Sequence, residues 1–342
     1  MPRPRLPRTR LPLRLAGIVV ALAFGTLLVL WLIPSSDYIL LPDRAKPVEP
    51  LITVPHEGIK AGKGGIYYVD VLVRRATVLE QIFPGLHDGS TIVPAHALNP
   101  PGVNDSQRRQ ADLRDMARSQ DIAAAVALRE LGYKVVARPT GVLVNAIDAS
   151  APAAGKLRPT DLITAVDGKA VLTIAQLRAA MAVKRPGDTV TYRVRRGSGV
   201  AQVTLRTVAA TNDPKRAIAG FAPEQGSEIK LPVAVRIDAG EVGGPSAGLP
   251  FALGVLEELG RDVDRGTVVA ATGEIFLDGT VGPVGGIEQK TLGARRAGAQ
   301  VFLVPAGDNA AEARRYAGGM RVVPVESFRQ ALSALATPAR KA

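Results

Sequence analysis

Cysteine is absent from this 342-residue sequence, and aromatic residues make up only 4% of it. Without a thiol, the chain can form no disulfide framework, no thiolate zinc site and no cysteine nucleophile. Histidine is scarce too, and the three present show neither metal-ligand spacing nor the pattern of a catalytic triad. They are His56, His87 and His96. We therefore expect no metal site and no cofactor.

A nucleotide-binding loop is also missing. No Gly-x-x-x-x-Gly-Lys-Ser/Thr sequence occurs, and Gly62-Lys63-Gly64-Gly65 lacks both the spacing and the following hydroxyl. Nucleic-acid binding is not expected despite a net charge of +12, because the basic residues are spread out without interleaved aromatics. Several arginines instead precede one apolar segment: Arg3, Arg5, Arg8, Arg10 and Arg14.

That apolar segment, residues 15–33, is uncharged and about long enough to cross a bilayer, and Trp31 lies near its far end. The arginines before it predict a cytoplasmic segment, residues 1–14, and an extracytoplasmic remainder. A cleaved signal peptide is the alternative, but residues 33–37 contain no Ala-x-Ala site. The sequence thus predicts a single-pass protein of the cell membrane.

The next segments carry weaker signals. Residues 34–63 begin with Pro34 and also contain Pro42, Pro47, Pro50 and Pro55, and are predicted to be an extracytoplasmic linker. A β-rich run over residues 65–73 predicts a strand, and residues 84–105 are rich in turn formers. Residues 119–131 predict a helix that stops at Gly132.

Three motifs between residues 133 and 208 are similar to a protease-associated PDZ domain. They are Gly-Val-Leu-Val-Asn-Ala-Ile (141–147), Ser-Ala-Pro-Ala-Ala-Gly-Lys-Leu (150–157) and Asp-Leu-Ile-Thr-Ala-Val-Asp-Gly (161–168). PDZ domains bind a peptide as an added strand. The resemblance implies a peptide-binding edge at Thr140, Gly141, Val142, Leu143 and Val144, and an opposite wall formed by the helix 174–183, with Leu177 and Met181 facing the sheet. A PDZ-like domain that no longer binds peptide is the alternative.

A candidate nucleophile lies further on, in Gly-Gly-Pro-Ser-Ala-Gly (243–248). This motif places the Ser246 hydroxyl before an apolar helix-like run, where free backbone N–H groups converge. Serine needs a neighbouring base, and Lys290 is the candidate provided that burial keeps it neutral. The alternative is a plain turn at Ser246 and a surface cation at Lys290.

From Ile237 onward the chain resembles the proteolytic domain of Lon-type serine proteases. The resemblance rests on Gly-Pro-Ser-Ala-Gly (244–248), Ala-Thr-Gly-Glu-Ile (271–275), Val-Gly-Pro-Val-Gly-Gly-Ile (281–287), Lys290 and Ala-Gly-Ala-Gln-Val-Phe-Leu-Val-Pro (297–305). It implies that Ser246 is the nucleophile, Lys290 the general base and Thr272 the hydroxyl that orients the lysine. Backbone N–H groups at Gly244 and Ala247 are expected to stabilise the oxyanion. Gly243 replaces the aspartate usual in ATP-dependent members, which points to the membrane-anchored branch that combines PDZ and Lon-like domains.

Together these features predict an α+β fold. It comprises a transmembrane helix, a first part of the protease domain with a connecting helix at residues 64–132, a PDZ module of the β-sandwich or barrel type at 133–208 and a Lon-type α/β domain at 213–337. Because the strand 65–73 resembles one that begins the protease domain, the PDZ module looks inserted. The predicted function is ATP-independent cleavage of extracytoplasmic proteins or peptides, with a homo-oligomer possible because Lon-like domains commonly form rings. Two alternatives are a catalytically inactive PDZ scaffold at the membrane and a Ser-His hydrolase that recruits His87 or His96.

Overall fold

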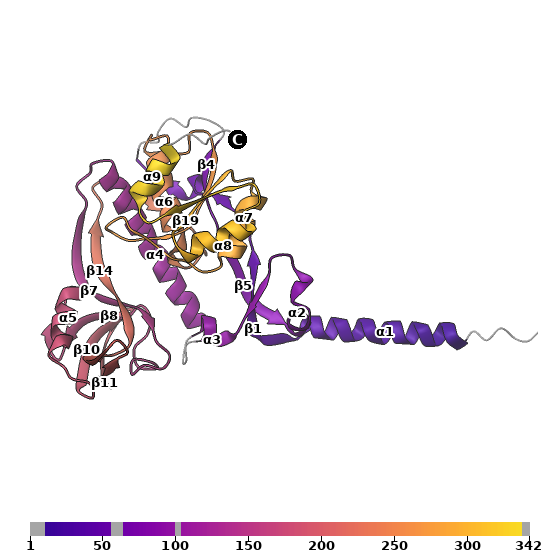
Figure 1. The fold of residues 1–342 in the computed structure, drawn as a ribbon, viewed down its shortest axis with the longest axis horizontal. Helices are drawn as coiled ribbons and strands as arrows, with labels where there is room; N and C mark the ends of the chain where they lie inside the picture. Colours follow the sequence, from indigo (N-terminus) through magenta and orange to yellow (C-terminus); the bar gives the residue numbers. More distant parts are fainter. Residues whose placement is uncertain (1–10, 56–63, 100–103, 337–342) are drawn as a thin grey trace, which may run out of the picture. The chain divides into compact units, whose positions relative to one another are not determined.

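The computed structural model describes residues 11–55, 64–99 and 104–336. The chain divides into two compact units, one formed by residues 1–42 and 71–98 and the other by residues 43–70 and 99–342 (Figure 1). Residues 1–10 of the predicted cytoplasmic segment, and His56, lie outside the described residues.

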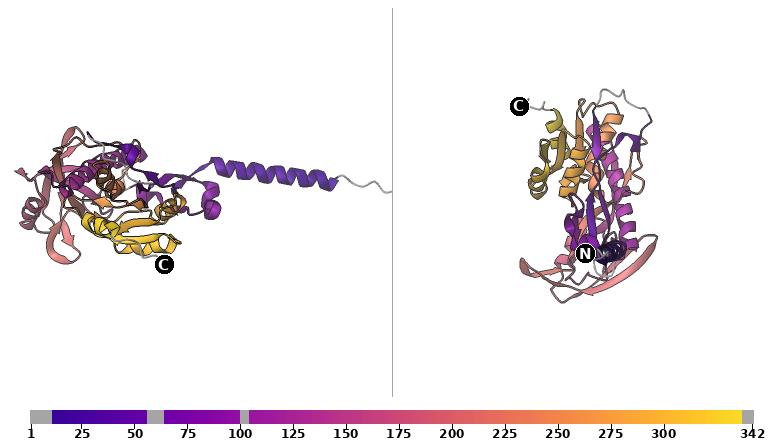
Figure 2. Two further views of the ribbon diagram at one scale, coloured as in Figure 1. Left: turned by 90° about the horizontal axis from the view of Figure 1, so that it is seen from above. Right: turned by 90° about the vertical axis from the view of Figure 1, so that its right-hand side faces the viewer.

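The first unit combines one long helix with a small sheet. Helix α1 (Leu11–Leu32) is a single straight helix that projects from the small sheet of this unit (Figure 2). Its residues 15–32 form a stretch that is long and apolar enough to cross a membrane. Strand β1 (Pro34–Pro42) lies antiparallel between β5 (Val71–Thr77) and β6 (Thr91–Val93). Three short helices complete the unit: α2 (Val78–Ile82), η2 (Pro84–Leu86) and α3 (Ala95–Leu98).

The predicted linker over residues 34–63 is wrong for most of its described part. Tyr38 and Ile39 are buried in the centre of β1, and Pro34 and Pro42 stand at its two ends, where a missing N–H is tolerated. The segment after β1 belongs to the second unit, where it forms β2 (Lys46–Pro47), η1 (Glu49–Leu51) and β3 (Ile52–Thr53). Its Val48, Ile52 and Val54 are buried in the core. Proline content alone was therefore not enough to predict an extended linker here.

A five-stranded sheet forms the centre of the C-terminal half of the second unit. Its order is β2, β4 (Gly65–Tyr68), β16 (Val268–Ala271), β19 (Val301–Pro305), β20 (Arg321–Val325). All pairs except β2 with β4 are parallel. Five helices accompany the sheet: α4 (Asp105–Glu130), α6 (Gly248–Glu258), α7 (Ile287–Arg296), α8 (Asp308–Tyr316) and α9 (Phe328–Ala336).

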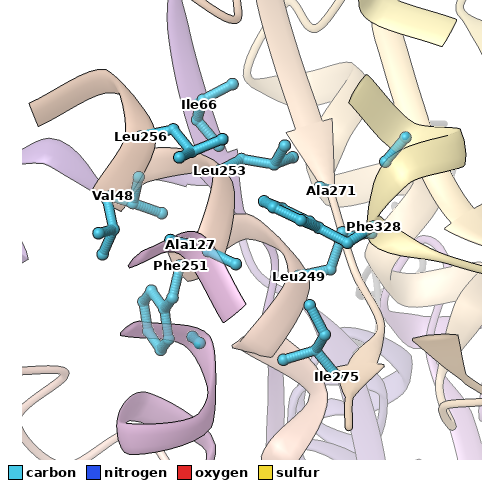
Figure 3. Close-up of a cluster of buried hydrophobic side chains, with 14 of the residues drawn as sticks. Val48, Ile66, Ala127, Leu249, Phe251, Leu253, Leu256, Ala271, Ile275 and Phe328 are labelled. Atoms are coloured by element: carbon cyan, nitrogen blue, oxygen red, sulfur yellow. The ribbon is translucent and has the colours of Figure 1, made fainter. Parts of the chain in front are cut away.

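Alternation along the strands separates two cores, one on each face of this sheet. Val269 and Leu303 pack with α4, α6 and α9, whereas Ala270 and Phe302 pack with α7 and α8. Figure 3 shows the first core, in which Leu249, Leu253 and Leu256 of α6 lie among side chains from the sheet and from α9. Each such buried side chain contributes about 1.5–3 kcal/mol. This packing fixes the start of α6, which follows Ser246 directly.

Two predicted elements differ from those observed. The run 65–73 is not one strand, because it divides between β4 in the second unit and β5 in the first. The helix predicted at 119–131 begins much earlier, at Asp105, because Asn104 and Gln107 form a capping box there. It ends as expected before Gly132, which has a φ of 87°. Since β4 pairs with β16, the strand before the PDZ segment does belong to the sheet of the C-terminal domain.

The PDZ segment forms a separate antiparallel sheet with its own core. The order along it is β11 (Gly199–Arg206), β10 (Thr189–Arg196), β8 (Leu162–Val166), β7 (Val136–Ile147), β14 (Phe221–Lys230), and β9 (Lys169–Ala170) pairs with β8. Helix α5 (Ile174–Ala182) packs on it through buried Leu177. Between β11 and β14 lies a hairpin of β12 (Val208–Ala210) and β13 (Asp213–Ile218).

Candidate active site

The loop that carries Ser246 is held in place by helix α4. A 3₁₀ turn, η3 (Pro245–Ala247), leads directly into α6. The Gly244 N–H donates to the Asp112 carbonyl at 2.7 Å, and Ser119 Oγ donates to the Pro245 carbonyl at 3.1 Å. Strand β15 (Arg236–Ile237), paired with β3, anchors the chain before this loop. The nucleophile loop is therefore fixed on the N-terminal side of Ser246, and on the other side it continues into α6.

Lys290 lies on α7 and is only 4% exposed. Its Nζ donates to Thr272 Oγ1 at 3.3 Å, and the Thr272 hydroxyl in turn donates to the Ser246 carbonyl at 3.2 Å. The Gly273 N–H donates to the same carbonyl at 2.9 Å. Thr272 and Gly273 immediately precede β17 (Glu274–Ile275), which pairs with β18 (Val281–Gly282). Thr272 thus links Lys290 to the backbone of Ser246, so the three predicted catalytic residues lie close together.

Burial sets the protonation of the lysine. Desolvation of the ammonium lowers the pKa of Lys290 to about 8, and the negative charge of Asp70 opposes this shift. Asp70 follows β4 and forms an ion pair with Lys46 at 3.4 Å. A lysine with this pKa is partly neutral near physiological pH, so its nitrogen can accept a proton.

One of the two predicted oxyanion donors is wrong. The Gly244 N–H is already donated to Asp112, so this group is not available to a substrate. Pro245 has no N–H to offer. Ser246 and Ala247 follow in the first turn of the η3–α6 segment, where backbone N–H groups need acceptors from outside the helix. The role of the Ala247 N–H as an oxyanion donor thus stays a prediction. The N–H of Ser246 is a second candidate donor beside it.

Acidic groups gather beside the nucleophile loop. Asp115, Glu224 and Glu274 surround Arg118 next to Pro245. Burial raises the pKa of Asp115 to about 6 and that of Glu274 to about 7. Arg118 pairs with Glu224 and donates to the Gln225 carbonyl at 3.1 Å, which joins α4 to β14.

Sequence reasoning missed the residues that hold the site together. Asp112 and Ser119 are seven positions apart on α4, which places them on one face of the helix. That spacing could have identified the face, but nothing in the sequence shows which loop it contacts. The histidine alternative gains no support from His87, whose ring nitrogen is 2.7 Å from Glu80 Oε1.

The predicted peptide-binding edge at Thr140–Val144 is not a free edge. Strand β7 is paired with β14 over almost its whole length, and on its other side Val142 and Leu143 pair with β8. The two end strands of the sheet are β11 and β14, and β14 is the one beside β7. Pro223 fits this position, because proline is tolerated on edge strands.

A cavity of about 760 Å³ lies where α5, β13 and the start of β14 meet. Leu177, Met181, Tyr192 and Phe221 give it an apolar lining. Four cations line it as well, Arg178, Lys184, Lys215 and Arg216, together with Asp213. Lys184 is ion-paired with Asp167 at 2.6 Å. The loop into β14 is closely fitted, because a Cβ at Gly220 would lie 2.0 Å from Ala151 Cβ.

Comparisons with known proteins agree with these two parts. Residues 129–207 match the family model of the PDZ domain, and residues 215–336 match that of the Lon protease (S16) C-terminal proteolytic domain. Strand β14, which completes the PDZ sheet, thus falls within the Lon match rather than the PDZ match.

Full-length relatives are Lon proteases. Lon protease 1 of Sorangium cellulosum is 29% identical over 267 residues, which cover 69% of this chain and 32% of that protein. Lon protease 2 of Bacillus subtilis is 25% identical over 203 residues, covering 58% of this chain and 34% of the relative. The chain therefore spans about a third of the length of these relatives.

Among solved structures, a PDZ domain of an SdrC-like protein from Listeria monocytogenes is 27% identical and covers 25% of this chain and 87% of its own, with a TM-score of 0.23. Both resemblances noted in the sequence are confirmed by the family models. The chain thus carries a PDZ domain and a Lon-type proteolytic domain on one polypeptide.

Proposed function

We propose that this chain is a membrane-anchored, ATP-independent serine endopeptidase in which Ser246 and Lys290 act as a catalytic dyad. The observation that carries the proposal is the buried Lys290, whose pKa is lowered to about 8 and whose Nζ is linked to the nucleophile loop through Thr272. A lysine with only a structural role would gain nothing from this desolvation. The match to the Lon proteolytic domain agrees with it.

In the proposed mechanism, Ser246 Oγ attacks the carbonyl carbon of the scissile peptide bond. Neutral Lys290 takes the hydroxyl proton and then returns it to the leaving amine, and in the second half-reaction it takes a proton from the attacking water. The N–H groups of Ser246 and Ala247 would stabilise the oxyanion. Thr272 would hold the lysine nitrogen in position, since its hydroxyl is fixed by the Ser246 carbonyl.

Covalent labelling tests the nucleophile. The full-length protein is incubated with a peptidyl fluorophosphonate, and the adduct is located by tandem mass spectrometry. We expect the label on Ser246 and none on Ser246→Ala. Failure to label the folded native protein, together with no peptide cleavage, would favour the inactive PDZ scaffold. A label that stays on Ser246 in Lys290→Met but is lost when His87 or His96 is replaced would favour a Ser-His hydrolase.

Activity is expected to rise with pH through the pKa of Lys290. The base must be neutral, so between pH 7 and pH 9 the active fraction should grow roughly tenfold for a pKa of about 8. Asp70→Asn removes a charge that raises this pKa, so the midpoint of kcat/KM should move to lower pH. Glu274→Gln is the control, because it should leave the midpoint near 8. A midpoint insensitive to Asp70→Asn would assign the titration to another group.

We also propose that the peptide partner of the PDZ domain binds along β14, not β7. The support is the position of β14 at one end of the sheet and the adjoining cavity, whose apolar lining suits an apolar last residue and whose Arg178, Lys215 and Arg216 suit a free carboxylate. Because β14 also contacts α4 through the Arg118–Glu224 ion pair, the same strand joins the groove to the helix that holds the nucleophile loop.

Substitutions at the end of α5 test this groove. Met181→Lys places a charge in the apolar lining and should weaken binding of such a peptide about tenfold or more, as should amidation of the peptide's carboxylate. Val183→Lys is the matched control, because Val183 is 80% exposed on the same segment. The measurement is fluorescence anisotropy of a labelled peptide. Equal effects of the two lysine variants would refute the assignment to β14.

A membrane anchor completes the proposal. Helix α1 supports it with residues 15–32, whose side chains are largely exposed and apolar. The arginines before this helix favour a cytoplasmic N-terminus, which places the proteolytic domain outside the cytoplasm. Substrates would then be flexible segments of extracytoplasmic proteins, because no unfolding engine is part of the proposed mechanism.

A further inference from the structure

A short apolar loop in the first unit is exposed beside the end of α1. Residues 82–86, Ile-Phe-Pro-Gly-Leu, contain no polar side chain, and all five are exposed. Ile82 is 54% exposed, Phe83 52% and Leu86 45%. Single exposed apolar residues are common on protein surfaces, whereas contiguous exposed ones mark an interaction site. This run is therefore a candidate interaction site.

The loop has a defined conformation. Helix α2 begins with a capping box between Thr77 and Glu80, and the Leu86 N–H donates to the Phe83 carbonyl at 3.1 Å. Ser90 Oγ closes the far side by donating to the Pro84 and His87 carbonyls, at 3.1 and 2.8 Å. The apolar side chains are therefore presented outward by a braced turn and not by a loose segment.

Two contacts fix the position of the 82–86 loop along the axis of α1. The Val78 N–H donates to the Ile33 carbonyl at 3.0 Å, which ties the start of α2 to the end of the apolar helix. The ring of His87, the residue after the loop, lies 6.2 Å from the ring of Trp31. The loop thus comes back to the level of Trp31, inside the last turn of the apolar stretch, where aromatic residues mark the membrane interface.

We propose that residues 82–86 form a second membrane contact, which dips into the interfacial zone of the bilayer beside α1. This inference rests on the proposed anchor, since the apolar surface of α1 continues into the loop. The occupant is the lipid interface, because the loop lies at the depth of an interfacial tryptophan and carries apolar side chains without charge. Two points of contact would restrict rotation of the first unit about the axis of α1.

The absence of cysteine makes the test direct, because any single cysteine can be labelled specifically. The full-length chain is reconstituted in phosphatidylcholine vesicles that contain lipids with a nitroxide near the headgroup end of the acyl chain. Phe83→Cys carries an environment-sensitive fluorophore. Leu72→Cys is the matched control, because Leu72 is 54% exposed but lies five residues, roughly 16 Å, further along β5 from the membrane end at Thr77. Leu28→Cys reports on α1 itself.

We expect the nitroxide lipids to quench the labels at positions 83 and 28 by at least half, with little effect at position 72. If the label at position 28 is quenched but the label at position 83 is quenched as little as the label at position 72, this inference is overturned and the anchor is left intact. A blue-shifted label at 83 without lipid quenching would show that protein covers the loop and would also overturn it. Absence of quenching at 28 would refute the anchor, and the loop contact with it.

Discussion

Lys290→Arg is expected to reduce kcat/KM on a fluorogenic peptide by at least about a thousandfold at every pH. General-base catalysis contributes roughly 10²–10⁴-fold, and a guanidinium cannot give up its proton in a protein. Arginine is also larger than lysine, and Lys290 is only 4% exposed, so the variant would strain the contact with Thr272. The measurement is the full pH profile of turnover from pH 6 to pH 10.

Lys290→Met separates the loss of the base from the steric strain that arginine would introduce. Methionine is apolar and close in size, so it should keep or raise the thermal midpoint while remaining as inactive as the arginine variant. Folding of both is followed by circular dichroism. If Lys290→Arg kept near-native turnover, the lysine could not be the general base, and a structural role would have to replace it.

Gly248→Ala should reduce turnover about a hundredfold while the protein stays folded. A Cβ at this position would lie 2.8 Å from Ile275 Cγ2 and 2.8 Å from Ser119 Oγ, which is tighter than real contacts allow. Ser119 fixes the Pro245 carbonyl, so relief of the clash must shift the nucleophile loop. A displacement near 1 Å at a catalytic group costs on the order of 10²-fold in rate.

Gly254→Ala is the matched control on the same helix. Its Cβ would lie 2.4 Å from Val48 Cγ2 and 2.7 Å from Ile52 Cδ1, so it should also destabilise the protein, by about 1–3 kcal/mol. Those contacts are two turns away from Ser246, so turnover per folded molecule should change little. Similar losses of turnover in both variants would mean that activity follows stability alone.

The candidate site could be proposed from the sequence because its residues stand in short motifs. Ser246, Thr272 and Lys290 each stand in a glycine-rich or apolar run, and the burial expected of Lys290 is what the structure has. Gly244 was misjudged, because its neighbour Asp112 comes from a helix more than a hundred residues earlier. Such a contact cannot be predicted from the sequence of the loop itself.

The PDZ domain shows the same limit at the level of strands. The strand 141–147 is recognisable from its own motif, but its outer neighbour is β14, a strand with Gly226 and Pro223 that has weak β propensity. Which edge of a sheet stays open depends on every other strand in it. The first unit was missed for a related reason, since β1, β5 and β6 come from separate parts of the chain and form a sheet only together.

The pairing of β4 with β16 has a consequence for biosynthesis. Gly65 pairs with Val268, so one strand of the proteolytic sheet leaves the ribosome about 200 residues before its partner. At 5–20 residues per second, β4 waits roughly 10–40 s, while the whole PDZ segment is made and can fold. A nascent chain that already carries Ser246 therefore lacks a complete sheet until β20 has also been synthesised, so the proposed active site cannot be assembled before then.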